Sequence, residues 1–277
     1  MLENPRFHFP EVMGFMLMPF SELMRSAQDA PGRCTVDVPD DWLQGRSVFG
    51  GLQVALALRA MRTLVPDAPL RTLQVLFAAP VPAGCMRAQA HVLRKGKSAT
   101  HVEARVLDGE NCLVLVVGVF GAARESVVSL QPQQPVIDDR HAVPFRFVPG
   151  VTPAFTQHFA SRWLRGHLPF TGMATREIVV EIAMRDTGNA SEGHVLAIAD
   201  LIPPVALSHL KKPAPGSSMT WMLEFITDRF TELSLDGWRV DAELVFAGAG
   251  YTSQTAMIWG PGGLPVALSR QSMVVFG

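Results

Sequence analysis

The sequence predicts an α+β fold of two tandem units, each a long helix wrapped by an antiparallel β-sheet. An apolar segment of helical character is followed by a series of segments in which apolar and polar residues alternate. The same order of segments then recurs in the second half of the chain. Because a helix that is apolar on nearly all sides must be enclosed by other structure, we expect each sheet to curl around its helix.

The first unit begins with a strand-like stretch from Cys34 to Asp40. Residues 52–64 are rich in strong helix formers, and Pro66 and Pro69 end this predicted helix. Alternating residues then predict strands, separated by turns such as Lys95-Gly96 and Asp108-Gly109. These strands are expected over residues 71–77, 85–94, 98–107 and 112–120.

The middle of the chain, from residue 122 to about 175, is rich in proline, and predicts a long connection with a short helix near 155–168. A helix candidate in the second half begins near His194. Strands are expected over residues 176–185, 218–225, 238–246, 250–259 and 264–276. We therefore divide the chain into an N-terminal unit (1–125), a connecting segment (126–175) and a C-terminal unit (176–277).

The two halves can be aligned by hand, which indicates an internal duplication. One constant spacing separates Gly45 from Gly193, Thr72 from Thr220 and Phe77 from Phe225. Both halves end in Val-Phe-Gly, and aligning these ends places Leu115 opposite Gln271. The helix alignment places residues 51–52 opposite Ala199 and Asp200. Polar groups thus occur in one copy where the other is apolar.

Asp200 is the carboxylate that needs an explanation, because it lies within an apolar segment. Burial without a partner would raise its pKa and oppose folding. The residue therefore caps a helix, is paired with a basic or hydrogen-bonding group, or takes part in a reaction. Ser218 opens the next strand, and a period of two places Ser218 and Thr220 on one face of it. Gln271 lies in the last strand. A carboxylate, a hydroxyl and a carboxamide could meet in such a unit.

Composition and charge exclude several classes of protein. The 277 residues are 48% hydrophobic and 18% charged, with a net charge of -1, which gives no electrostatic signature for nucleic acid or an anionic membrane. Cys34, Cys85 and Cys112 form no C-x-x-C pair, which favours reduced thiols. Residues 12–20 are apolar but lack a basic region before them, and no run reaches the ~18 residues of a membrane span. We expect a soluble cytoplasmic protein.

Other site motifs are missing or incomplete. The sequence has no G-x-S-x-G nucleophile elbow, and Gly248-Ala-Gly250 lacks the third glycine of a dinucleotide loop. The histidines show no metal-ligand spacing, and we expect His91 and His101 at the surface or at a sheet edge. The prediction is therefore no metal and no cofactor.

Several segments together resemble the double-hotdog acyl-CoA thioesterases, in particular the acyl-CoA thioesterase II (TesB-like) family. The resemblance covers most of the chain, and the order and spacing of its segments are more specific than any one of them. These segments are Ser47-Val-Phe-Gly-Gly-Leu-Gln-Val-Ala, Leu70-Arg-Thr-Leu-Gln-Val-Leu-Phe, Pro80-Val-Pro-Ala-Gly, Arg94-Lys-Gly-Lys-Ser and Leu264-Pro-Val-Ala-Leu-Ser-Arg-Gln.

The resemblance implies a site of an Asp near the start of the second-half helix, a Thr or Ser at the start of the following strand, and a Gln in the last strand. These fall on Asp200, Ser218 and Gln271, with Thr220 as an alternative hydroxyl. The family's implied reaction is attack of an activated water on the thioester of an acyl-CoA, giving the free acid and CoA. The family also implies a possible homodimer of such chains.

Two alternatives remain open. The first is an acyl-thioester hydratase or dehydratase on the same fold, although its Gly-Asp-x-Asn-Pro type signature is missing from this sequence. The second is a non-catalytic acyl-CoA binding protein, which would bind acyl-CoA without releasing a thiol.

Overall fold

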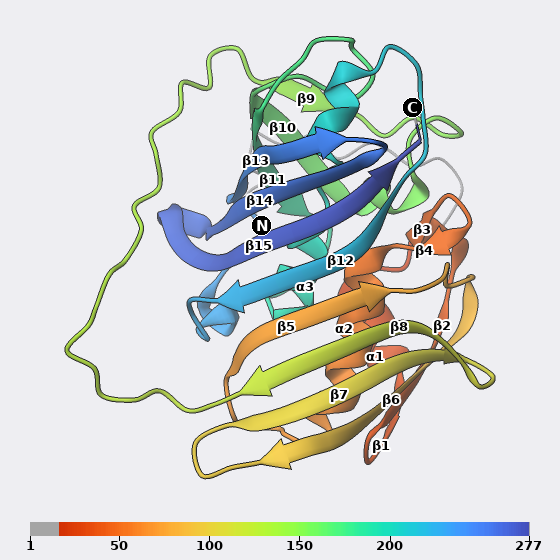
Figure 1. The fold of residues 1–277 in the computed structure, drawn as a ribbon, viewed down its shortest axis with the longest axis vertical. Coiled ribbons are helices and arrows are strands. Elements are labelled where there is room, and N and C mark those ends of the chain that lie inside the picture. The colour runs from red at the N-terminus through yellow and green to blue at the C-terminus, as the bar shows by residue number, and fades with distance from the viewer. Residues whose placement is uncertain (1–16, 277) are drawn as a thin grey trace.

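The computed structural model describes residues 17–276, which form one long antiparallel sheet with the main helices on one of its faces (Figure 1). The strand order is β1-β2-β6-β7-β8-β5-β12-β15-β14-β13-β11-β10-β9. The first half of the chain supplies β1 (Gln28–Ala30), β2 (Arg33–Val38), β5 (Leu70–Phe77), β6 (Gly84–Lys95), β7 (Thr100–Asp108) and β8 (Asn111–Phe120). The second half supplies β9 (Val143–Phe145), β10 (Phe159–Arg165), β11 (Glu177–Met184), β12 (Gly216–Phe225), β13 (Trp238–Gly248), β14 (Tyr251–Gly260) and β15 (Leu264–Val275).

The helices are short apart from one. The α-helices are α1 (Phe20–Ser26), α2 (Gly50–Arg62) and α3 (Glu192–Ala199). Five 3-10 turns connect other elements, namely η1 (Asp40–Trp42), η2 (Ala154–His158), η3 (Val205–His209), η4 (Phe230–Glu232) and η5 (Pro261–Gly263), and β3 (Leu43–Gln44) pairs with β4 (Ser47–Val48). No helix within residues 17–276 is long and apolar enough to cross a membrane. The apolar stretch predicted over 12–20 lies, up to residue 16, outside the described residues.

The sequence pattern predicted α2 and the long strands correctly, but it was wrong about the short helix at 155–168. Only η2 is helical there, and residues 159–165 form strand β10. Phe159, Ala160 and Trp163 are buried in β10, which pairs with β11 on one side and β9 on the other. Strand pairing and burial thus override the local preference. The boundaries drawn at 126 and 175 stay a prediction; Figure 1 shows this connection running outside the sheet before it reaches β9.

The two main helices pack against each other through glycines. A Cβ on Gly51 of α2 would lie 2.9 Å from the Cα of Ala197 in α3, and a Cβ on Gly193 of α3 would lie 3.6 Å from the Cβ of Ala55 in α2. The same contact therefore occurs twice, with the roles of the helices exchanged. Glycine permits this close approach because it has no side chain.

This exchange indicates that an approximate twofold axis relates the two halves. The pairing of the two central strands is consistent with the same axis. Strands β5 and β12 pair with each other, with Leu73 opposite Leu223 and Val75 opposite Trp221. Leu73 and Trp221 are therefore counterparts, as the sequence spacing of Phe77 and Phe225 predicted. We call two residues counterparts when they occupy the same place in the two halves.

Two parts of the sequence alignment were wrong. The helix contact makes Gly51 the counterpart of Gly193, and therefore Leu58 the counterpart of Asp200. The spacing that relates the strands does not apply to the helices, because the connections between helix and strand differ in length in the two halves. In the last strand, Gln271 pairs with Trp221 as Gly118 pairs with Leu73, so the counterpart of Gln271 is Gly118 and not Leu115.

Candidate functional site

Asp200 lies directly after α3 as its C-cap, where its backbone N–H donates to Leu196. The expectation that it lies near the start of the second-half helix was therefore wrong. α3 ends here because Pro203 and Pro204 cannot continue a helix. Asp200 instead faces the start of the other helix, since its carboxylate accepts a hydrogen bond from the backbone N–H of Gly51 in α2.

The carboxyl group of Asp200 is enclosed, although the residue as a whole keeps some exposed surface. Burial raises the pKa of Asp200 to about 7, and the hydrogen bonds from Gln271 and Gly51 oppose this rise by favouring the carboxylate. The group therefore changes protonation near neutral pH. A carboxyl group with such a pKa is suited to accept a proton from water and return it within one reaction.

The start of α2 reaches Asp200 only because its first residue is glycine. A Cβ on Gly50 would lie 2.6 Å from Oδ2 of Asp200 and 3.4 Å from the ring of Phe77. The positive end of the α2 dipole thus faces the carboxylate. Hydrogen-bond donors at a helix start also suit a negatively charged oxygen that develops during a reaction.

Gln271 of β15 is buried, with 4% of its surface exposed, and its Nε2 donates to Oδ1 of Asp200 across 2.6 Å. Its Oε1 accepts a hydrogen bond from Nε2 of Gln254 in β14, at 3.4 Å. The sequence prediction that Asp200 and Gln271 come together agrees with this geometry. Gln254 was not singled out from the sequence; the signal was an amide at an inward position of an alternating strand.

Ser218 lies on the inner face of β12 because the strand contains a β-bulge between Ser218 and Thr220. Ser218 pairs with Met273, which is buried, whereas Thr220 pairs with Ser272 and is exposed. The prediction that Ser218 and Thr220 share a face was therefore wrong. Ser218 is a diagonal neighbour of Gln271, which places the two residues roughly 7–8 Å apart.

The hydroxyl of Ser218 makes no hydrogen bond to another side chain within residues 17–276, Asp200 included. The structure thus brings Asp200 and Gln271 together, and it places Ser218 beside them on the inner face. Thr220 lies on the other face of the strand.

The equivalent place in the first half is apolar. Leu58 stands where the second half has Asp200, and Gly118 where it has Gln271. A Cβ on Gly118 would lie 3.0 Å from the sulfur of Met61, so that side chain fills the space there. Ser218 corresponds to Leu70, which precedes the matching bulge in β5. Of these two places, only the one in the second half carries polar groups.

Comparison with known families matches both halves of the chain. Residues 38–121 match the acyl-CoA thioesterase N-terminal domain, and residues 132–275 match the acyl-CoA thioesterase C-terminal domain. The chain belongs to the acyl-CoA thioesterase family. A search of curated protein sequences gives no match.

Solved structures show that this family member has the double hotdog fold. A conserved protein of unknown function with a hotdog fold from Alicyclobacillus acidocaldarius superposes with a TM-score of 0.80 at 20% identity, covering 91% of this chain and 96% of the other. A tesB protein from Mycobacterium avium subspecies paratuberculosis gives 0.75 at 11% identity (93% and 99%). The acyl-CoA thioesterase II TesB2 from Mycobacterium marinum gives 0.68 at 16% identity (90% and 94%).

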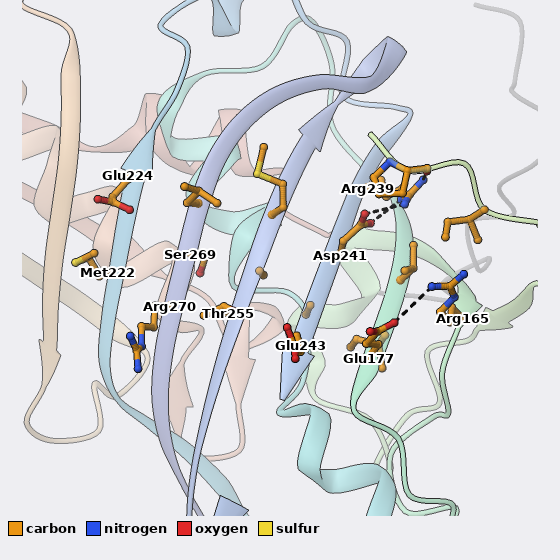
Figure 2. Close-up of a pocket in the computed structure, with 18 residues that line it drawn as sticks. Arg165, Glu177, Met222, Glu224, Arg239, Asp241, Glu243, Thr255, Ser269 and Arg270 are labelled. Carbon is orange, nitrogen blue, oxygen red and sulfur yellow. Dashed lines mark hydrogen bonds and ion pairs between the residues drawn. The ribbon is translucent and has the colours of Figure 1, made fainter. Parts of the chain in front are cut away.

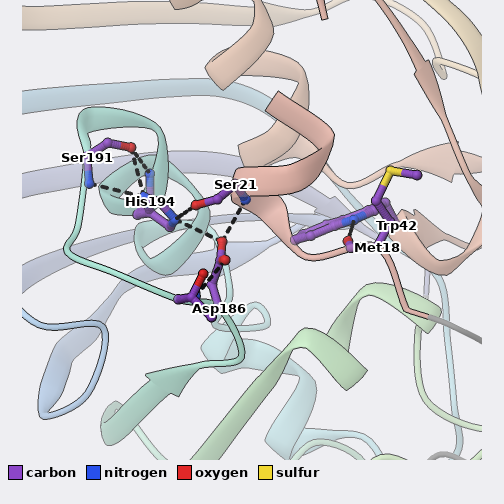
Figure 3. Close-up of polar contacts among 7 residues, drawn as sticks. Met18, Ser21, Trp42, Asp186, Ser191 and His194 are labelled. Atoms are coloured by element: carbon purple, nitrogen blue, oxygen red, sulfur yellow. Dashed lines mark hydrogen bonds and ion pairs between the residues drawn. The ribbon is translucent and has the colours of Figure 1, made fainter. Parts of the chain in front are cut away.

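A second polar cluster in this acyl-CoA thioesterase family member surrounds His194 (Figure 3). Ser21 and Asp186 both approach its Nε2, at 3.3 and 3.1 Å, and the backbone N–H of Ser191 donates to its Nδ1 across 3.0 Å. Because Nδ1 accepts, Nε2 carries the proton and donates it. Oγ of Ser191 also lies 2.8 Å from Nδ1, across the ring from Asp186, but the same hydroxyl accepts a hydrogen bond from the backbone N–H of His194 as the N-cap of α3, so it serves the helix cap.

The His194 cluster has a structural role instead. Ser191 and His194 form the capping box of α3, and the backbone N–H of Ser21 in α1 donates to Asp186 across 2.6 Å. Burial alone would raise the pKa of Asp186, but the hydrogen bonds from His194, Ser21 and Thr187 outweigh it and lower that pKa. The cluster therefore anchors α1 to the start of α3.

A groove of about 650 Å³ lies on the outer face of the second-half sheet (Figure 2). Its charged side chains are largely paired, with Arg239 bound to Asp241 and Arg165 to Glu177. Arg270 lines the groove, while the next residue, Gln271, points to the opposite face of β15. The groove and Asp200 are thus separated by the sheet. Within residues 17–276, no three His, Cys, Asp or Glu side chains gather as a metal site would require.

Proposed function

We propose that this chain hydrolyses the thioester of an acyl-CoA to a free acid and CoA, using a water held by Asp200, Gln271 and Ser218. The observation that carries the proposal is the enclosed carboxylate of Asp200, with a pKa near 7, bound by the Gln271 amide and the start of α2. Membership of the acyl-CoA thioesterase family supports the substrate class.

The proposed reaction begins when the carboxylate of Asp200 removes a proton from water as the water oxygen attacks the thioester carbonyl carbon. The carbonyl oxygen becomes an oxyanion in the tetrahedral intermediate, and the positive end of the α2 dipole favours that charge. The intermediate then collapses, the carbon–sulfur bond breaks, and the CoA thiolate takes the proton from Asp200. The carboxylate is regenerated, and neither a metal nor a redox step is required.

Ser218 and Gln271 are proposed to hold the attacking water. Gln271 also hydrogen-bonds Asp200, which keeps the carboxylate oriented. The family resemblance further supports a role in lipid metabolism, a location in the cytoplasm and a homodimer of double-hotdog chains, and these form part of the proposal.

The test is release of free thiol from short, medium, long and aromatic acyl-CoAs by the wild type and by Asp200→Asn. We expect the wild type to release thiol and the variant to lose about 100-fold or more in kcat/KM with its fold intact. Equal activity of both proteins would reject Asp200 as the base. Binding of acyl-CoA by both proteins without thiol release would instead identify a binding protein.

A further inference from the structure

Gln254 links the backbone of η3 to Gln271. It lies on the inner face of β14 with 2% of its surface exposed, and its Oε1 accepts a hydrogen bond from the backbone N–H of Val205 across 2.9 Å. Its Nε2 donates to Oε1 of Gln271 at 3.4 Å, near the long end of the hydrogen-bond range. Both polar ends of this buried amide are therefore occupied.

The direction of these bonds follows from the first donor. A backbone N–H can only donate, so Gln254 must turn its oxygen toward Val205 and its NH2 group toward Gln271. Gln271 must then turn its oxygen toward Gln254, which leaves its own NH2 group facing Asp200. The opposite orientation of Gln271 would place its oxygen against the carboxylate.

Val205 and Asp200 are ends of the same short segment. Asp200 closes α3, Pro203 and Pro204 follow, and Val205 begins η3. Because the prolines end the helix, the N–H of Val205 is available to Gln254 instead of a helical carbonyl. The hydrogen bonds through Gln254 and Gln271 thus return to Asp200 and close a ring.

The first half supplies an internal comparison. Gln254 pairs with Gln271 in the second half as Val102 pairs with Gly118 in the first, so the counterpart of Gln254 is Val102, which is fully buried. The sheet therefore tolerates an apolar residue at this position. The amide is present in the half that also holds Asp200, which links it to the site rather than to the fold.

We propose that Gln254 is a positioning residue for thioester hydrolysis, which holds the Gln271 carboxamide with its NH2 group toward Asp200. This inference rests on the proposed function for its catalytic consequence, but the orientation itself concerns only Asp200, Gln254 and Gln271. Gln254 acts through Gln271 and does not touch the substrate. None of the groups that shift the pKa of Asp200 is a charged side chain, so the Gln271 amide is its main side-chain partner.

The experiment is a double-mutant cycle of Gln254→Met, Gln271→Met and the double variant. The first readout is the pKa of Asp200, followed by carboxyl carbon NMR, and the second is the pH profile of kcat/KM for thiol release. The control is Thr252→Val, which removes a buried polar group from the same face of β14, where Thr252 binds the Phe246 carbonyl.

We expect Gln254→Met to raise the pKa of Asp200 and to lower kcat/KM about 10- to 100-fold, as loss of an orienting partner does. In the Gln271→Met background the same substitution should cause no further change, and Thr252→Val should leave both readouts near wild type. The proposal is overturned if Gln254→Met leaves the pKa of Asp200 unchanged, or if its effect is equal in both backgrounds.

A second variant and a readout that does not depend on activity keep the result decisive. Gln254→Val installs the residue found at the counterpart position, Val102, and breaks both hydrogen bonds without adding a charge, so the same cycle can be run if Gln254→Met does not fold. If the wild type releases no thiol, the proposed function fails, while the pKa of Asp200 in the cycle still decides the role of Gln254.

Discussion

Ser218 and Thr220 lie on opposite faces of β12, although only Met219 separates them. The β-bulge at this point inserts one residue against the partner strand β15, which reverses the side of the sheet that each hydroxyl faces. The two hydroxyls that the sequence could not distinguish are therefore distinguished by strand register.

This register predicts different results for the two hydroxyls. Ser218→Ala should lower kcat/KM for acyl-CoA about 10-fold or more, because we propose that the hydroxyl on the inner face helps to hold the attacking water. Thr220→Val is the matched control and should stay within about 2-fold of the wild type, since Thr220 is exposed on the outer face. A larger loss in Thr220→Val than in Ser218→Ala would reject the assignment.

Gly50 is predicted to be required for the site. Gly50→Ala would place a methyl group 2.6 Å from Oδ2 of Asp200, so the carboxylate or the helix start must move. We expect kcat/KM to fall about 100-fold, as for a displacement near 1 Å. Gly216→Ala, whose Cβ would meet its nearest atom at 3.6 Å, should leave steady-state kinetics unchanged. Equal kinetics in both variants would show that α2 does not approach Asp200 this closely.

The pKa of Asp200 predicts that activity and stability respond to pH in opposite directions. Activity should rise as pH passes through about 7, because the carboxylate is the form that accepts a proton from water. The folded pKa of about 7 exceeds the value of 3.8 for an unperturbed carboxyl group, so between these pH values the native state binds more protons than the unfolded state. The free energy of unfolding therefore falls as pH rises through this window.

Most of the measurable loss should lie between pH 5 and pH 8. From pH 5 to the folded pKa of about 7 is two units, over which the free energy of unfolding should fall by about 3 kcal/mol. Denaturant unfolding of the wild type and of Asp200→Asn at both pH values isolates this contribution, since the variant lacks the titrating group. An identical pH dependence of the two proteins would contradict the raised pKa.

Removing the ring of His194 should destabilise the fold without affecting the chemistry. His194→Ala leaves the carboxylate of Asp186, with 1% of its side chain exposed, without its imidazole partner, and also removes half of the α3 capping box. We expect the free energy of unfolding to fall by about 3 kcal/mol, as for a buried charged group that loses a hydrogen bond, measured by denaturant titration. His91→Ala, at an exposed position of β6, should change it by less than about 0.5 kcal/mol.

The kinetics of the same variants complete this prediction. Below its unfolding transition, His194→Ala should keep a kcat/KM near that of the wild type, because the cluster lies at the far end of α3 from Asp200. A large loss of kcat/KM with unchanged stability would give His194 a part in catalysis instead.

The sequence predicted the elements whose burial pattern repeats regularly. Residues 52–64 are apolar around the whole helix, and strands such as 238–246 alternate, so both could be recognised without tertiary information. The pairing of Asp200 with Gln271 was also predicted, although only through the family resemblance. These features depend on local pattern or on a shared motif order.

The remaining features depend on register, which a single sequence does not encode visibly. The bulge in β12 has no glycine or proline to mark it, so a strict period of two placed Ser218 and Thr220 on the same face. The alignment of Leu115 with Gln271 relied on a shared Val-Phe-Gly ending, whereas strand pairing makes Gly118 the counterpart. Gln254 was not singled out because its partners, Val205 and Gln271, are distant in sequence.

The contact between Gly51 of the first half and Asp200 of the second has a consequence for how such a protein can change over generations. In a dimer of identical units every substitution appears at both places, so a residue that suits one must be tolerated at the other. In a single chain the two places can carry different residues. The first half supplies a helix start that binds the carboxylate of Asp200, while Leu58, Leu70 and Val102 are buried core residues. A single chain therefore permits a division of labour between its two halves.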